Sequence, residues 1–209
     1  MSTHSFLLIS ALLLGGYALV GCGNGQERQA ETVSSSAAVA VDVVKSKQEL
    51  DGVVSALKNM RDASDSADLK KLHADLAMHA KQLNDADTTV VASCDTAVAA
   101  GKSQQDAWHK QADAFTDAGL RTASQQREGN LRTAVEALST ARGALKMEGD
   151  AFQSLLSQTV SALDLDLTQS GVQTIKPTLS KLIASEPGVR RALTDVADQG
   201  RAVNTAINP

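Results

Sequence analysis

The sequence predicts an all-α fold, an elongated antiparallel helical bundle or coiled coil of long helices with shorter helices at the C-terminal end. Apolar residues recur at intervals of three and four along most of the chain, which is the spacing of one helix face. No segment alternates apolar and polar residues, so no sheet is expected. Aromatic residues make up only 2% of the chain. The core must therefore be built from Leu, Val and Ala over long contact surfaces, as in narrow bundles.

The first helix is predicted over about residues 37–63. Its apolar stripe contains Val43, Leu50 and Leu57 at heptad spacing, with Val53 and Met60 between them. The polar run that follows ends at Asp68, whose carboxylate can cap the next helix.

The second helix is predicted over about residues 67–121. A stripe runs from Leu69 to Val90, weakens, and resumes from Trp108 to Gly119 with a shifted phase. A phase shift of this kind inside a continuous helix is a stutter, which locally relaxes supercoiling. We therefore expect one long helix, with a bend near Gly101.

The third helix is predicted over about residues 126–163, where the stripe is most regular, with Ser124 as its cap. Beyond it, prolines interrupt the pattern. Pro177 should start or kink a helix turn, and Ser185 to Gly188 should stop one short helix and start the last. Short loops between such helices make them antiparallel neighbours.

The chain begins with an apolar run from Phe6 to Val20. As a helix this run would rise only about 22 Å, less than the hydrocarbon core of about 30 Å, so it has the length of a signal-peptide hydrophobic region. It ends in Leu19, Val20, Gly21 and Cys22. This ending resembles the lipobox of bacterial lipoproteins, in which the Cys thiol accepts a diacylglycerol and the peptide is cut on its amino side. The alternatives are an ordinary secretory cleavage and a chance Cys after a short anchor helix.

The resemblance implies three segments. Residues 1–21 would be a lipoprotein signal peptide, residues 22–36 a flexible tether rich in small and polar side chains, and residues 37–209 a single helical bundle domain. It also implies a covalent lipid on Cys22 and a place in the cell envelope. Because Cys22 is followed by Gly23 and not Asp, we expect the outer membrane, facing the periplasm.

Charge and motifs argue against several function classes. The formal net charge is −4, and the chain has no cluster of Lys and Arg larger than an isolated doublet, so no nucleic acid is expected as a partner. The doublets are Lys45 with Lys47, Lys70 with Lys71, and Arg190 with Arg191. Gly101-Lys102-Ser103 lacks the earlier Gly of a phosphate loop, because Thr96 stands there. Ser55 and Lys58 have the spacing of an acyl-serine enzyme without its other elements. His73 and His79 fall on different helix faces, so we expect no metal site.

Cys94 has two interpretations. With Cys22 assigned to lipid, Cys94 has no intramolecular disulfide partner. It lies beside the second stripe, so it is either a small buried hydrophobic residue or, in an oxidising compartment, half of an intermolecular disulfide between two tethered copies.

The segment from Trp108 to Leu167 resembles the bacterial envelope family catalogued as domain of unknown function 2959. The matching positions are Trp108, Leu120, Arg121, Ser124, Asp164 and Leu167. The chain departs from such sequences at Asp166-Leu167-Thr168, where they tend to carry a Lys-His-Asn run. The resemblance implies a small lipoprotein with a helical body, and it implies no activity.

These observations predict a membrane-tethered, non-enzymatic helical scaffold or protein-interaction adaptor in the cell envelope. A sustained apolar stripe can present an extended face to a partner helix, and no nucleophile, base and orienting group can be named together. The expected partners are the membrane through the lipid anchor, and envelope proteins or a second copy of the chain. The alternative is a bundle that binds lipid or the membrane surface.

Overall fold

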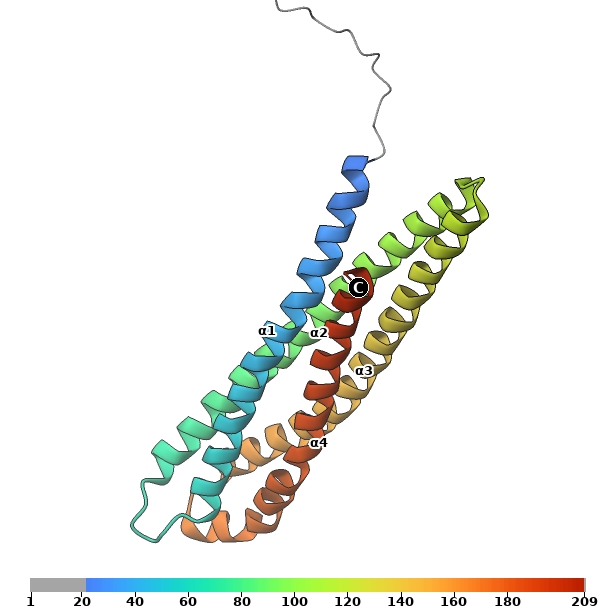
Figure 1. The fold of residues 1–209 in the computed structure, drawn as a ribbon. Helices are drawn as coiled ribbons and strands as arrows, with labels where there is room; N and C mark the ends of the chain where they lie inside the picture. The colour runs from blue at the N-terminus through green and yellow to red at the C-terminus, as the bar shows by residue number, and fades with distance from the viewer. Residues whose placement is uncertain (1–21, 209) are drawn as a thin grey trace, which may run out of the picture.

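The computed structural model describes residues 22–208, which form four long α-helices joined by short turns (Figure 1). The helices are α1 (Cys22–Arg61), α2 (Leu69–Ala114), α3 (Ala118–Leu165) and α4 (Gln169–Ile207). Each runs antiparallel to the one before it. Within the described residues there is no strand. The predicted all-α bundle of long helices is confirmed.

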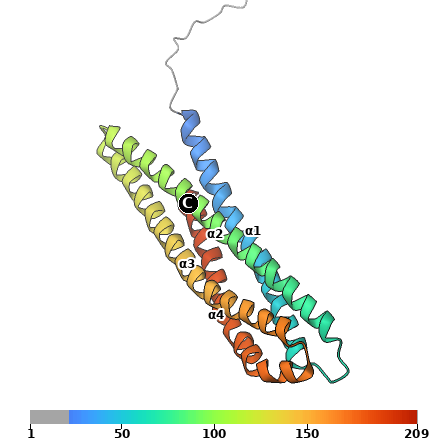
Figure 2. The same ribbon diagram turned by 180° about the vertical axis from the view of Figure 1, so that it is seen from behind.

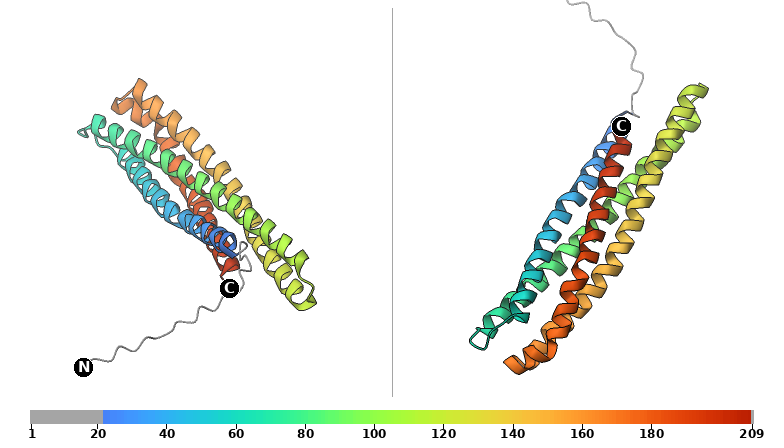
Figure 3. Two further views of the ribbon diagram at one scale, coloured as in Figure 1. Left: turned by 90° about the horizontal axis from the view of Figure 1, so that it is seen from above. Right: turned by 60° about the horizontal axis from the view of Figure 1, so that its bottom comes forward.

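The four helices form a closed ring of neighbours. α1 packs against α2 and α4, and α3 packs against the same two helices from the opposite corner. Figures 2 and 3 show this arrangement from behind, from above and from below. One continuous core runs between the helices, built from Leu and Val with few aromatic residues. Its largest fully buried side chains are Leu50, Leu57, Met60, Leu76, Leu83, Leu131, Leu138, Leu145, Leu156, Leu163, Leu179 and Leu182.

Each turn is closed by a side-chain N-cap. Asp68 Oδ1 accepts a hydrogen bond from the Lys71 amide at 3.1 Å, and Asp117 Oδ1 accepts one from Leu120 N at 2.8 Å. Thr168 Oγ1 caps α4 in the same way. Each cap satisfies an amide that has no partner within its own helix. The role predicted for Asp68 is confirmed.

The bundle has an uneven end. The last residues of α4 lie level with Gln29 of α1 and Arg127 of α3, because Gln29 Nε2 donates to Asn208 Oδ1 and Arg127 donates to the Ile207 carbonyl. α2 and α3 continue past this level as a two-helix hairpin. The start of α1 extends in the same direction, and in Figure 1 it diverges from the hairpin.

The boundary between the second and third helices differs from the prediction. A single helix over 67–121 is wrong, because the chain turns between Phe115 and Asp117. The cap is Asp117 and not Ser124, which lies inside α3. The apolar phase continues through the turn, so the sequence pattern alone cannot place the break there.

Gly101 lies in the interior of α2 and does not end it. A Cβ atom built on Gly101 would come within 2.5 Å of Val135 Cγ2 on α3. This glycine therefore allows α2 and α3 to approach closely.

Residues 22–36 are helical, so the predicted flexible tether is wrong. Thr32 and Ser36 are buried, and their hydroxyls donate to the carbonyls of Arg28 and Val33 within the same helix. Because the polar groups are satisfied locally, a segment of small polar residues can pack in the bundle. Gly200 contributes by letting α4 approach the Ser36 carbonyl, whose oxygen would lie only 3.2 Å from a Cβ atom at position 200.

The predicted shorter C-terminal helices are also wrong, because α4 is a single helix of 39 residues that contains Pro177 and Pro187. Both prolines are exposed. The carbonyl groups that each proline deprives of a partner can therefore bind water, and the buried stripe of α4 continues unbroken past both.

Candidate functional site

Cys22, the last residue of the predicted lipidation motif, lies at the uneven end of the bundle. Leu19, Val20 and Gly21 are outside the described residues, and Cys22 is the first residue of α1. In Figure 1 the start of α1 and the tip of the α2–α3 hairpin point to the same end of the molecule. Over residues 22–208, no helix has the length and hydropathy needed to cross a bilayer.

The hairpin tip carries apolar side chains that the bundle does not cover. Leu120 is 57% exposed, and Phe115 is half-buried in the turn itself. The turn is held by Arg121, whose guanidinium donates two hydrogen bonds to the Phe115 carbonyl, at 2.6 and 3.1 Å. The apolar groups are therefore presented by a rigid turn.

Behind the tip, the two helices of the hairpin are joined by aromatic and charged contacts. The Arg127 guanidinium lies 4.8 Å from the centre of the Trp108 ring, a cation–π distance. His109 Nδ1 lies 3.2 Å from Glu128 Oε2 and Nε2 lies 3.7 Å from Asp113, so the exposed His109 is surrounded by carboxylates.

An open cleft separates the start of α1 from α2. It has a volume of about 720 Å³ and is lined by Arg28 from α1 and by Lys102, Ser103, Asp106 and Lys110 from α2. Among the described residues, no carboxylate forms an ion pair with any of the three basic side chains, and the buried Nε atom of Arg28 has no hydrogen-bond partner. The cleft is therefore a positively charged recess near the start of α1.

The outer face of α1 carries an exposed apolar stripe. Val41 is 69% exposed and Val44 is 67% exposed. Ala37 precedes them at helical spacing and is also exposed, and the next position of the stripe is Gln48. This α1 stripe, Ala37, Val41, Val44 and Gln48, contains no charged residue.

A polar layer crosses the middle of the bundle at Asp87. Ser46 Oγ on α1 donates to Asp87 Oδ1 at 2.5 Å, and Gln153 Nε2 on α3 reaches Asp87 Oδ2 at 3.4 Å. Burial raises the pKa of Asp87, and the two hydrogen bonds partly oppose this shift. A hollow of about 220 Å³ opens beside it, between α2 and α3. The layer joins three helices and favours one register.

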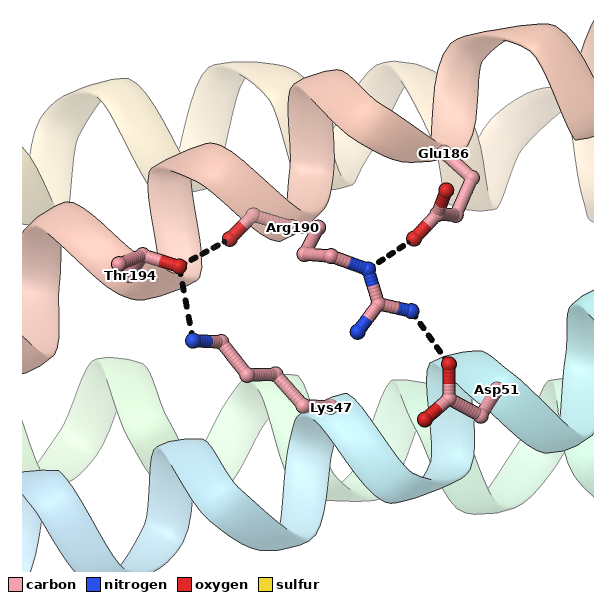
Figure 4. A network of polar contacts seen from close by, with 5 residues as sticks. All are labelled: Lys47, Asp51, Glu186, Arg190 and Thr194. Carbon is pink, nitrogen blue, oxygen red and sulfur yellow. Dashed lines mark hydrogen bonds and ion pairs between the residues drawn. The ribbon is translucent and has the colours of Figure 1, made fainter.

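A second polar group forms the seam between α1 and α4 (Figure 4). Lys47 Nζ donates to Thr194 Oγ1 at 2.7 Å, and Arg190 pairs with both Asp51 and Glu186. Arg190 is thus paired with one carboxylate on each of the two helices, and the Lys47 ammonium is hydrogen-bonded to a hydroxyl. These contacts join α1 to α4, and their polar groups bind one another.

Cys94 lies in the core and none of its surface is exposed. Burial is the largest cause that raises the pKa of its thiol to about 12, with Asp95 and Asp42 adding to the shift and Arg142 opposing it. A thiol in this state is neither ionised nor accessible to a second chain. The structure favours the interpretation of Cys94 as a buried hydrophobic residue over the intermolecular disulfide.

The remaining predicted residues do not come together. His73 lies 3.2 Å from Asp164, whereas His79 lies 3.8 Å from Glu49 on α1. Within residues 22–208, no three His, Cys, Asp or Glu side chains are arranged so that they could hold a metal ion. Lys102 and Ser103 lie in the middle of α2 and so form no loop around a phosphate, and Ser55 and Lys58 lie exposed on α1.

Sequence reasoning missed the cleft and the α1 stripe. The cleft depends on Arg28, which falls in the segment predicted to be a tether. The stripe could not be recognised in the sequence, because its valines are interspersed with buried ones. Val39 and Val43 are buried, whereas Val41 and Val44 are exposed, and only the orientation of α1 in the bundle distinguishes the two pairs. The hairpin tip had no clear signal in the apolar pattern, which weakens between Val90 and Trp108, whereas the chain turns after Ala114.

Comparisons with protein-family models, with curated proteins and with solved structures find no match for this chain.

Proposed function

We propose that this protein is a lipid-anchored, non-enzymatic helical scaffold or adaptor of the cell envelope, and that it presents the outer face of α1 to a protein partner. The single observation that carries the adaptor role is the α1 stripe. The anchor is supported by the sequence that ends at Cys22, with residues 1–21 as the signal peptide and the outer membrane, facing the periplasm, as the proposed location. Membership of the family catalogued as domain of unknown function 2959 belongs to the same proposal.

The α1 stripe is suited to helix docking. Val41 and Val44 expose most of their surface on one side of a long helix, and the stripe itself is uncharged, with the exposed Lys45 at its edge. Amphipathic helices recognise each other through apolar residues at such three- and four-residue intervals. Away from α1 and the hairpin tip, the large exposed hydrophobic residues stand singly, which is ordinary for a protein surface; they are Met78, Met147 and Leu165.

The anchor is tested in cells with a fatty acid that carries an alkyne group. The full chain should incorporate this label and fractionate with membranes, and Cys22→Ala should lose both properties because the thiol is the acceptor. Cys94→Ala is the matched control and should keep the label. Incorporation of label by Cys22→Ala would contradict the proposed anchor.

The adaptor role is tested with a photo-reactive amino acid placed at Val41 or Val44. Each should yield the same cross-linked product in intact cells. The matched control is Ser139, an exposed position on α3. A product that also forms from Ser139, or that survives when Val44→Asp is combined with the cross-linker at Val41, would contradict the α1 stripe as the docking face.

The alternative function, a bundle that binds lipid or the membrane surface, is favoured by the exposed apolar hairpin tip at the end where α1 begins.

A further inference from the structure

Three features lie at the end of the molecule where α1 begins. They are the proposed lipid attachment at Cys22, the apolar hairpin tip with Phe115 and Leu120, and the basic cleft between α1 and α2. α4 does not reach this end, because its last residues lie level with Gln29 and Arg127. The hairpin therefore projects beside the start of α1 with no other helix of the bundle in front of it (Figure 1).

We propose that the α2–α3 hairpin is a second membrane contact, which rests on the same phospholipid bilayer that holds the anchor. Leu120 and Phe115 enter the boundary between headgroups and acyl chains, and the cleft faces the phosphates of anionic headgroups. The proposal rests on the lipid anchor at Cys22. The bilayer itself is the partner that contacts this end of the molecule.

The distance between Phe115 and Trp108 along α2 matches the depth to which an apolar element enters a bilayer surface. Trp108 lies about 10 Å behind Phe115 along α2, from a helical rise of about 1.5 Å per residue. An interfacial apolar element is buried by about 5–10 Å. When the tip is inserted to that depth, Trp108 stands at the level of the headgroups, where Trp side chains are enriched.

The basic side chains of the cleft also lie at a depth that suits a bilayer surface. Arg28 lies about 9 Å from Cys22 along α1, and the cleft places it opposite the α2 segment that carries Lys102 and Lys110. Long basic side chains extend towards the interface from such a distance. Arg28 and Lys110 thus stand just behind the level of the anchor, where anionic lipid headgroups are found, and Lys102 lies about 12 Å farther back along α2.

The acidic groups near the tip are mostly engaged with the protein. Asp117 caps α3, and Asp113 and Glu128 lie beside His109. Asp106 lines the cleft, where basic side chains outnumber it by three to one. The net charge that the cleft offers to the bilayer is positive, whereas the chain as a whole has a formal net charge of −4. Glu27 and Glu31 are exposed beside Arg28 on α1, so the attraction of anionic lipid headgroups is to the cleft and not to this end as a whole.

Trp108 is the only tryptophan of the chain, so its fluorescence reports on the hairpin alone. The mature chain from Cys22 is coupled through the Cys22 thiol to maleimide lipid in vesicles of phosphatidylethanolamine and phosphatidylglycerol. Cys94 does not couple, because it is buried. Lipids brominated near the headgroup should quench Trp108 and its emission should shift to shorter wavelength. Coupled protein with unquenched Trp108 would overturn the proposal.

Substitutions separate a docked tip from mere proximity. Leu120→Asp should lose most of the quenching, because a carboxylate cannot enter the acyl boundary. Leu165→Asp is the matched control, since Leu165 is 90% exposed at the opposite end of α3, and it should be quenched like the unsubstituted chain. Circular dichroism checks that both variants are folded. Equal quenching of the two variants would overturn the proposal.

The cleft is tested by combining Lys102→Glu with Lys110→Glu. On vesicles with phosphatidylglycerol this variant should be quenched less than the unsubstituted chain, and the difference should shrink on vesicles that lack anionic lipid. If the variant and the unsubstituted chain were quenched equally on both vesicle types, headgroup binding in the cleft would be contradicted. Because the coupling replaces cellular lipidation, an unquenched Trp108 contradicts the tip contact alone, whereas absence of fatty-acid label on Cys22 in cells contradicts the anchor.

Discussion

Gly101→Ala should destabilise this protein, although alanine is the better helix former. A Cβ at position 101 would meet Val135 Cγ2 at 2.5 Å, a distance at which one of the two helices or the Val135 side chain must shift. Val is β-branched and stiff about its first torsion, so it yields less readily than a long side chain. Gly143→Ala is the matched control, because Gly143 is exposed in α3 and a Cβ there meets nothing within 4 Å.

The two substitutions should change the free energy of unfolding in opposite directions. Overpacking a close helix contact costs about 2 kcal/mol. Replacing Gly by Ala inside a helix gains about 1 kcal/mol. Gly101→Ala should therefore lower the free energy of unfolding by about 1 kcal/mol, and Gly143→Ala should raise it by about 1 kcal/mol.

Urea denaturation followed by circular dichroism measures both variants, in a chain that starts at residue 22 and carries Cys22→Ser. The transition midpoint should fall for Gly101→Ala and rise for Gly143→Ala, with the slope unchanged. Adding Val135→Ala to Gly101→Ala should cost less than the sum of the two single substitutions, because the removed methyl groups make room for the new one. If Gly101→Ala is as stabilising as Gly143→Ala, the close approach of α2 and α3 is refuted.

Three further predictions concern titration, reactivity and helix continuity. Burial raises the pKa of Asp87 above its ordinary 3.8, so its carboxyl favours the folded state at low pH and opposes it as the pH rises through the folded-state pKa. Asp87→Asn should therefore raise the urea midpoint at neutral pH, with an advantage that shrinks on acidification; an advantage independent of pH would contradict burial of the charge as the cause. The Cys94 thiol, with its pKa of about 12, should react with a maleimide only in denaturant and run as a monomer on a non-reducing gel, and rapid labelling of the folded chain would contradict its burial. Pro187→Ala should raise the free energy of unfolding by about 1–3 kcal/mol, because it restores a backbone donor inside a helix; a lower melting temperature would show that the ring itself contributes to packing.

The fold class could be predicted because helix periodicity is a local property of the chain. The stripe from Val43 to Met60 is buried in α1 as expected, and the regular stripe that includes Leu131 and Leu138 is buried in α3. Such a stripe must face a partner, and short turns make the neighbouring helix that partner.

The helix boundaries were harder to predict, because several residues could serve as the cap. Asp117 and Ser124 are both suitable N-cap residues. Asp117 is the cap because a turn there pairs Trp108 with Arg127 and His109 with Glu128 across the hairpin. These pairings join residues that are distant in sequence, so a local pattern cannot reveal them.

The segment 22–36 was misjudged for a related reason. Small and polar side chains are typical of a linker, but in α1 the backbone of Ser36 lies against Gly200, where a larger residue would hold the helices apart. Similarly, Pro177 and Pro187 interrupt a helix in most contexts, and α4 continues through them because its opposite face is buried along its whole length. In both places packing outweighs local propensity.

The sequence by itself determined that the described chain forms long helices, and it determined the residues of their buried stripes, because periodicity and composition are read along a single chain. It also carries the Cys22 motif on which the proposed anchor rests. Only the tertiary structure decided that Arg28, Lys102 and Lys110 share one cleft, that Val41 and Val44 face outwards, and that the hairpin tip lies at the end where α1 begins. These relations depend on the register between helices, which is set by contacts such as that of Gly101 with Val135 and is not encoded in any one stripe.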